Sequence, residues 1–491
     1  MENENHALEA VVSTGHPLAA QAARDMLEAG GSAVDAAIAA DAVMGVVEPM
    51  ATSIGGDVLA MLHEPDGNVI SYNGTGRAPA SLDVRMISAL PDARIPERHP
   101  LAVTTPGAVR GWWDLHRRYG RLNWTRLFMP AIRHARDGFA VARVAAKEWA
   151  LFDFVLRADP VCGRLYHVGK PPVEGERFLN PELADTLEMI AREGPDAFYL
   201  GQVASAAAEA VRTVGGTLSA DDFRAHQGNF EEPLSMDFCG ARVHECPPNT
   251  HGVAILEALA AIQAAGGGPR DPETWIRMVD STSIAMANAK RTVADPAGNT
   301  VCTVVVDPDG MAITLMSSIF KRFGSGIAVP GAGFCLQNRG FGFSEPGHVN
   351  GPAPGKRPYH TVVPGLTTRN GRFLLGMGVV GGLMQPQGQI QILTRVLAWG
   401  EDLQAALDAP RWRLEAGNTL AIEAGWPPAI ARALREAGYQ APHVAAGELG
   451  GRSDFGGAHA VMRGVDGKLF GAADPRKDGL WLRLDSRHRA G

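Results

Sequence analysis

The strongest constraint on the fold is a hairpin whose strands are both apolar. Residues 301–306 are β-branched and apolar, residues 307–310 read Asp-Pro-Asp-Gly, and residues 311–319 run back as a second apolar strand. Runs rich in β-branched residues on either side of such a turn are typical of paired strands. We therefore expect a buried β-hairpin over residues 301–319.

Further hairpins and helices alternate along the chain. Residues 58–62 with 69–72, and 460–462 with 469–471, read as hairpins, whereas residues 17–29, 253–265 and 387–399 read as helices. Hairpins mixed with helices predict antiparallel sheets covered by helices rather than a βαβ repeat. We expect an α+β fold, and no stretch of disordered composition divides it.

Bulk composition excludes several classes of protein. The 491 residues are 45% hydrophobic and 20% charged, with a net charge of −7, which does not favour nucleic acid as a partner. No apolar run reaches membrane-spanning length, so we expect no membrane partner. The polar, acidic start lacks the pattern of a secretory signal, and the five scattered cysteines fit a reducing compartment. A cytoplasmic location is expected.

Thr300 stands where the buried hairpin begins, directly after Gly298-Asn299. A threonine at this place suits self-cleavage between Asn299 and Thr300, because the freed α-amine can act as the base for the threonine hydroxyl. Most threonines that open a strand are there for β-propensity, so the pattern alone leaves both interpretations open.

Two short motifs resemble cofactor sites. Residues 376–381 match G-x-G-x-x-G, but no βαβ unit surrounds them and the following residues do not continue a helix from the last glycine. We expect Gly381 and Gly382 to present backbone N–H groups in a turn, as an oxyanion hole does. Residues 239–251 hold two cysteines and two histidines without the paired spacing of a zinc site. No cofactor and no metal are expected.

Several ordered blocks identify a family resemblance. The chain resembles the γ-glutamyltranspeptidase family of the N-terminal nucleophile hydrolase superfamily along nearly its whole length. The blocks that carry the resemblance lie at residues 13–19, 30–37, 48–49, 53–57, 105–107, 299–300, 380–382 and 471–476.

The resemblance implies a four-layer αββα sandwich and an inactive precursor that cleaves itself. The products are expected to be residues 1–299 and residues 300–491, which stay associated in one fold. Thr300 is implied as the nucleophile that attacks an amide of a small molecule, with Gly381 and Gly382 holding the oxyanion. Ser318 matches a hydroxyl residue near the nucleophile and is given a supporting role.

The chain departs from the family where a γ-glutamyl substrate is held. Thr75 stands at the position of the arginine, Phe341 at that of the acid, and Phe320 at that of an asparagine; His360-Thr361 replace a pair of serines. Without a carboxylate for its ammonium group, a γ-glutamyl compound would bury an unpaired charge. Classical glutathione hydrolysis is therefore not expected.

Other blocks resemble a bacterial subgroup with oxamate amidohydrolase-type enzymes; they lie at residues 323–326, 337–340, 357–361 and 385–388. Arg77 and Arg339 are the residues expected to meet a substrate carboxylate, because guanidinium binds carboxylate bidentately. Structural ion pairs are the competing interpretation of both arginines. Phe320 and Phe341 would also suit a larger apolar acyl group.

We expect an amidohydrolase for a small, non-γ-glutamyl substrate. The alternatives are a γ-glutamyltransferase or glutathione hydrolase, a side-chain acylase, and, from another class, an unprocessed homologue that only binds. The sequence leaves an oligomer possible.

Overall fold

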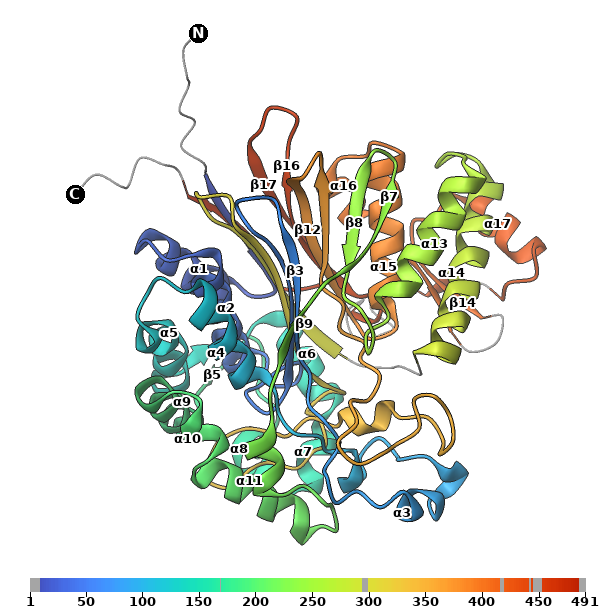
Figure 1. The fold of residues 1–491 in the computed structure, drawn as a ribbon. Helices are drawn as coiled ribbons and strands as arrows, with labels where there is room; N and C mark the ends of the chain where they lie inside the picture. The colour runs from blue at the N-terminus through green and yellow to red at the C-terminus, as the bar shows by residue number, and fades with distance from the viewer. Residues whose placement is uncertain are drawn as a thin grey trace.

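Two large antiparallel sheets lie face to face between two layers of helices (Figure 1). The computed structural model describes residues 9–167, 169–293, 299–415, 419–440, 443–444 and 453–484. The α+β class and the four-layer αββα sandwich expected from the sequence are confirmed. No helix within the described ranges combines the length and the apolar character needed to cross a membrane.

The first sheet has seven strands and contains the predicted hairpin as β9 and β10 at its centre. Its strand order is β18 (Leu480–Leu484), β1 (Ala10–Thr14), β9 (Asn299–Val306), β10 (Ala312–Phe320), β2 (Asp57–His63), β3 (Val69–Gly74) and β6 (Asn229–Glu231).

The second sheet has six strands. Its order is β17 (Leu469–Ala473), β16 (Gly457–Arg463), β12 (Arg372–Val380), β11 (Gly365–Arg369), β8 (Ala241–Glu245) and β7 (Leu234–Phe238). Two small sheets lie outside the sandwich: β13 (Trp412–Leu414), β14 (Leu420–Glu423) and β15 (His443–Val444) form one, and β4 (Phe139–Ala140) and β5 (Arg177–Phe178) form the other.

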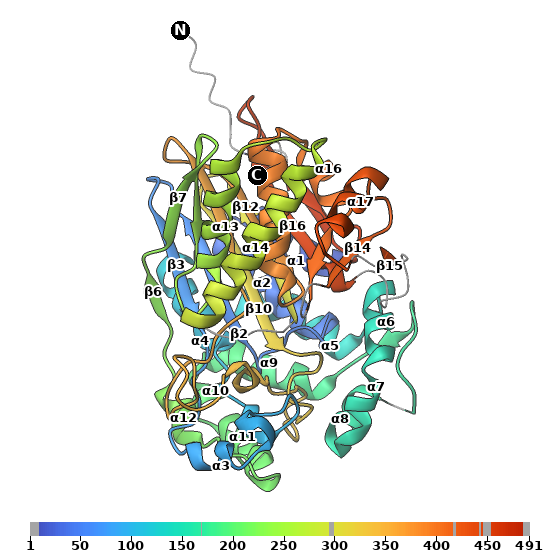
Figure 2. The same ribbon diagram turned by 90° about the vertical axis from the view of Figure 1, so that its right-hand side faces the viewer.

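Both outer layers consist of helices. The helices on the side of the first sheet include α1 (Pro17–Glu28), α2 (Ala33–Val47), α4 (Ala108–Tyr119), α5 (Trp124–Asp137) and α9 (Pro181–Glu193). The second sheet is covered by α13 (Gly252–Ala265), α14 (Pro272–Thr292) and α15 (Met384–Leu393), with α16 (Leu403–Asp408) and α17 (Pro428–Glu436) beside them (Figure 2). Shorter helices complete the fold: α3 (Val84–Ser88), α6 (Arg143–Leu151), α7 (Asp153–Ala158), α8 (Pro160–Tyr166), α10 (Asp196–Tyr199), α11 (Gln202–Thr213) and α12 (Ala220–Ala225).

Each interface between layers has its own apolar core. Cys302 and Val304 of β9 meet Val380 of β12 and Val461 of β16 between the two sheets. A second core lies between the first sheet and its helices, and a third between the second sheet and α13 to α15. Alternate β9 side chains therefore point at the second sheet, and Thr300 belongs to this inward-facing set because strand side chains alternate.

The predicted hairpins and helices are present, with one shifted boundary. The helix expected from residue 387 begins at Met384 instead. Pro386 lies in its first turn, where the missing N–H costs no helical hydrogen bond. The shift matters because it brings Gln385 onto the helix directly after Gly381 and Gly382.

Candidate active site

Thr300, the predicted nucleophile, is the second residue of β9 and is 2% exposed. Its Oγ1 accepts a hydrogen bond of 2.6 Å from Nε2 of Gln385, in the first turn of α15. The hydroxyl of the first sheet thus touches the helix that covers the second sheet. Asn299 lies in β9 with its backbone paired to Phe320, whereas residues 294–298 lie outside the described residues. The processing site therefore remains a prediction.

The end of β10 is distorted beside Thr300. The pairing of β10 with β9 shifts register between Ser317 and Phe320, and Phe320 has a φ of 76°. A positive φ is unusual for a bulky residue and is often found at functional sites. Ser318 Oγ accepts hydrogen bonds of 2.9 Å from the Phe320 N–H and from the Arg339 guanidinium. Ser318 therefore holds this bend in place.

Arg339 lies in a fully buried cluster of charged and polar groups. Its guanidinium donates to Ser318 Oγ and, at 3.2 Å, to Thr361 Oγ1, and its Nε is 4.0 Å from Asp57 Oδ2. The guanidinium also lies 4.1 Å from the centre of the Phe320 ring. Asp57 in turn is bonded to Nε2 of His360 at 3.2 Å. The structure thus brings five of the predicted site residues into one cluster with Asp57: Ser318, Phe320, Arg339, His360 and Thr361.

Burial and charge set the protonation of this cluster. Burial, then the positive charge of Arg339, lowers the pKa of His360 to about 4, so its ring is neutral near pH 7. The Val362 N–H donates to His360 Nδ1, which leaves Nε2–H to donate to Asp57. Burial opposes ionisation of Asp57, but the bond from His360 and the charge of Arg339 outweigh it and lower the pKa of Asp57. Burial lowers the pKa of Arg339 to about 9. Asp57 and Arg339 are therefore charged partners at neutral pH.

The double glycine forms the turn between β12 and α15. Gly381 and Gly382 have φ values of 112° and 62°, which favour glycine. A Cβ on Gly381 would lie 3.1 Å from the Cα of Gly456, so the turn also requires a close backbone approach. No oxygen in the described ranges accepts a hydrogen bond from the N–H of Gly381 or Gly382. Within those ranges, both N–H groups are without a protein acceptor.

An aromatic pair and a cation border the cluster. The rings of Phe320 and Phe341 have centroids 5.9 Å apart. Nζ of Lys321 lies 5.9 Å from the first ring and 5.3 Å from the second, and pairs with Glu97 at 3.4 Å. The two phenylalanines are thus close together, as the sequence placed them in one site, and they lie between two positive groups.

Arg77 is not brought into this cluster. Its side chain is exposed and donates to the Gly355 carbonyl at 3.2 Å. None of its hydrogen bonds among the described residues reaches Thr300 or Arg339. Thr75, two residues earlier, is fully buried and donates to Asn73 Oδ1 at 2.7 Å.

Three residues of this region were not predicted as site residues: Asp57, Lys321 and Gln385. Asp57 ends the Gly55-Gly56-Asp57 block, and Gln385 opens the Gln-Pro-Gln-Gly block, so both lay in motifs that the sequence marks. Lys321 carried no comparable signal. In the described ranges no group of three or more metal-ligating side chains gathers at this site or elsewhere.

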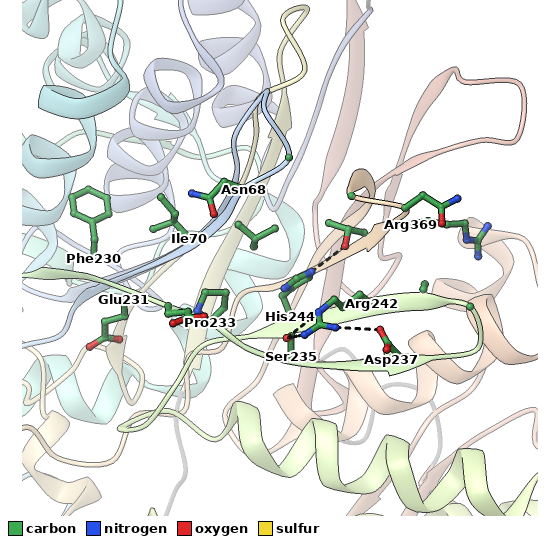
Figure 3. A pocket seen from close by; sticks show the side chains of 18 of the residues that line it. Asn68, Ile70, Phe230, Glu231, Pro233, Ser235, Asp237, Arg242, His244 and Arg369 are labelled. Atoms are coloured by element: carbon green, nitrogen blue, oxygen red, sulfur yellow. Dashed lines mark hydrogen bonds and ion pairs between the residues drawn. The ribbon is translucent and has the colours of Figure 1, made fainter.

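A cavity of about 880 Å³ lies elsewhere, between the start of β3 and the hairpins of the second sheet (Figure 3). Among its lining side chains, Arg242 donates to Ser235 and pairs with Asp237 at 3.5 Å. None of the predicted site residues lines it. This cavity and Thr300 lie at opposite ends of the first sheet. Val69, which lines the cavity, pairs with His63 at one end of β2, whereas the end of β10 near Thr300 pairs with Asp57 at the other end of β2. We do not assign the chemistry to this cavity.

Comparison with known proteins identifies the family. The family model described as Gamma-glutamyltranspeptidase matches residues 19–302 and 296–482. The "Glutathione hydrolase-like YwrD proenzyme" of Bacillus subtilis is 32% identical, with 96% of this chain and 97% of that protein covered. The "Oxamate amidohydrolase proenzyme" of Klebsiella pneumoniae is 31% identical over 98% and 99% of the two chains.

The fold agrees with this assignment. The crystal structure of a cephalosporin acylase from Bacillus halodurans superposes with a TM-score of 0.91 at 33% identity, covering 98% of this chain and 97% of that one. With the family model spanning both halves of the sandwich, the chain belongs to the γ-glutamyltranspeptidase family of enzymes.

Proposed function

We propose that this chain is a self-processing amidohydrolase whose nucleophile is Thr300. The observation that carries the proposal is the position of the Thr300 hydroxyl, buried at the start of β9 and bonded to the helix that follows Gly381 and Gly382. Several relatives are named as proenzymes, which supports self-cleavage here. Cleavage before Thr300 would free the α-amine that the reaction needs as its base.

The proposed reaction has two stages. Thr300 Oγ1 attacks the amide carbonyl and passes its proton to the α-amine, while Gly381 and Gly382 N–H groups hold the oxyanion. The C–N bond breaks, and the amine leaves with that proton. Water attacks the resulting ester and releases the acid. One donor of this kind contributes about 3 kcal/mol to the transition state.

The groups around the nucleophile favour a small acyl portion that carries a carboxylate. Arg339, which pairs with Asp57, and Lys321, which pairs with Glu97, lie beside Phe320 and Phe341. Neutral Thr75 occupies the position of the family's arginine. Oxamate has this chemistry, since its amide adjoins a carboxylate. We propose oxamate-like amides as substrates and not γ-glutamyl compounds.

The second candidate is an acylase for an aromatic or otherwise apolar acyl group. The contact between the Phe320 and Phe341 rings favours it, because two neighbouring aromatic side chains offer a large apolar surface. Relatives named as acylases are consistent with this candidate.

A substrate panel distinguishes the candidates. Purified protein and the variants Thr300→Ala and Thr300→Ser are assayed with oxamate, a γ-glutamyl anilide and a phenylacetyl amide. We expect the highest kcat/KM for oxamate, no hydrolysis by Thr300→Ala, and partial activity for Thr300→Ser, which keeps the hydroxyl. Hydrolysis by Thr300→Ala equal to that of the parent protein would refute the nucleophile. A preference for the phenylacetyl amide would select the acylase.

A further inference from the structure

Helix α15 carries four buried glutamines at alternate positions. Each side chain bonds to backbone groups of another segment, and the pairs four residues apart lie on common helix faces. The four are Gln385, Gln387, Gln389 and Gln391.

One face of α15 binds both backbone groups of a single residue, Val363, in the segment before β11. Gln385 Oε1 accepts a hydrogen bond of 3.1 Å from the Val363 N–H, and Gln389 Nε2 donates at 2.7 Å to the Val363 carbonyl. The other face binds β13. Gln387 and Gln391 each accept a hydrogen bond from a backbone N–H of β13 and donate one to a backbone carbonyl there. Only Gln385 also touches the predicted nucleophile.

The contact with Val363 fixes which way the Gln385 amide faces. A backbone N–H can only donate, so the atom of Gln385 that meets it has to be the oxygen. The NH₂ group then has to point at Thr300 Oγ1, 2.6 Å away. The side chain therefore offers the hydroxyl oxygen a donor, and cannot act as its base.

A buried acid, Glu245, lies close to Gln389. A Cβ on Gly365 would lie 2.5 Å from Gln389 Oε1 and 3.1 Å from Glu245 Oε1, so both oxygens border the same narrow space. Burial raises the pKa of the Glu245 carboxyl well above its usual range. Among the described residues, neither Gln389 Oε1 nor the two carboxyl oxygens of Glu245 have a hydrogen-bond partner.

We propose that Gln385 is a catalytic residue that stabilises Thr300 Oγ1 as a leaving group. The proposal rests on Thr300 being the nucleophile and names a step that the oxyanion glycines do not serve. Water attacks the acyl ester and gives a proton to the α-amine of Thr300; the carbon–Oγ1 bond then breaks, and its electron pair stays on Oγ1. A hydrogen bond from Gln385 stabilises this negative charge until the α-ammonium group of Thr300 returns a proton.

The same bond breaks during self-cleavage. Thr300 Oγ1 attacks the carbonyl carbon of residue 299, and its proton passes to the peptide nitrogen. The C–N bond breaks, so that this nitrogen becomes the α-amine and an ester joins the two segments. Water then hydrolyses the ester, and Oγ1 leaves as before. Gln385 is thus expected to act on ester hydrolysis in maturation as well as in turnover.

The variant Gln385→Glu tests the role with little change in shape. Its carboxylate keeps an acceptor for the Val363 N–H but cannot donate to Thr300 when ionised. We expect self-cleavage to slow about 100-fold, as for loss of one oxyanion donor. Hydroxylamine should speed cleavage of this variant, because it attacks the accumulated ester. With oxamate, mass spectrometry should detect the acyl-enzyme and kcat should fall more than the acylation rate.

Gln387→Glu is the matched control, since Gln387 lies on the other face of α15 and bonds to Leu383 and Leu414. It should mature and turn over at rates close to those of the parent. Equal losses in both variants, or parent-like rates in Gln385→Glu, would overturn the role of Gln385. A parent protein that neither cleaves itself nor forms an acyl-enzyme would instead refute the nucleophile, and Gln385 with it.

Discussion

Arg339 shows how one buried side chain can serve both stability and chemistry. Its guanidinium is fully buried, bonds to Ser318 and Thr361, and neutralises Asp57. Arg77 differs in each respect, because it is exposed and, among the described residues, its side chain donates one hydrogen bond, to the Gly355 carbonyl. From the sequence, both arginines were predicted alike to bind a substrate carboxylate. Their surroundings in the structure distinguish one from the other.

Replacing the two arginines should give different results. Arg339→Ala leaves Asp57 buried without its cation, and breaking such a pair costs about 3–5 kcal/mol. We expect urea unfolding to show this loss, together with a reduced kcat/KM for oxamate. Arg77→Ala should change the free energy of unfolding by no more than about 0.5 kcal/mol, as for other exposed sites.

The lysine variant separates charge from geometry. Arg339→Lys keeps the charge but lacks the planar fork that reaches Ser318 and Thr361 together, so it should recover stability only in part. If Arg339→Ala were as stable as the parent while its KM rose, the cluster would be a substrate site with no structural role, contrary to this account.

The glycines of β12 explain a motif that resembled a nucleotide site. A Cβ on Gly378 would lie 2.7 Å from the Cys302 sulfur and 2.6 Å from that of Met316, and one on Gly376 would lie 2.9 Å from Val304. The first two glycines of G-x-G-x-x-G therefore let the two sheets approach. The third, Gly381, begins the turn into α15.

Filling that contact should destabilise the sandwich. Gly378→Ala inserts a methyl group where no space exists, and overpacking of this kind costs about 1–3 kcal/mol. Gly268→Ala is the control, because nothing lies within 4 Å of its added Cβ. Denaturant unfolding should show the loss for Gly378 alone, and equal stabilities for the two variants would contradict the packing.

Features that depend on neighbouring residues could be predicted from the sequence, whereas features that depend on distant contacts could not. The hairpin of β9 and β10 and the glycine turn follow from neighbouring residues, so both were predictable. His360 and Asp57 are 303 positions apart, and Thr300 and Gln385 are 85 apart. Such contacts depend on how the sheets stack, which no local pattern specifies. Gln385 also looked like a loop residue, because Pro386 masked the start of α15.

At the scale of the whole molecule, the proposed cleavage would divide both sheets. The first sheet takes β1, β2, β3 and β6 from residues 1–299 and the other strands from residues 300–491. The second takes β7 and β8 from the first segment. Because β9 pairs with β1, and β10 with β2, separating the products would expose the sheet edges and the cores. The two segments are therefore expected to stay together after cleavage.

The mass of the purified chains tests the central claim most directly. We predict that native protein runs as one species, and that denaturation releases two chains, residues 1–299 and residues 300–491, the second with Thr300 as its free N-terminus. Thr300→Ala should give a single chain of 52.0 kDa. Protein that hydrolyses its amide substrate while remaining one uncut chain of that mass would contradict the account.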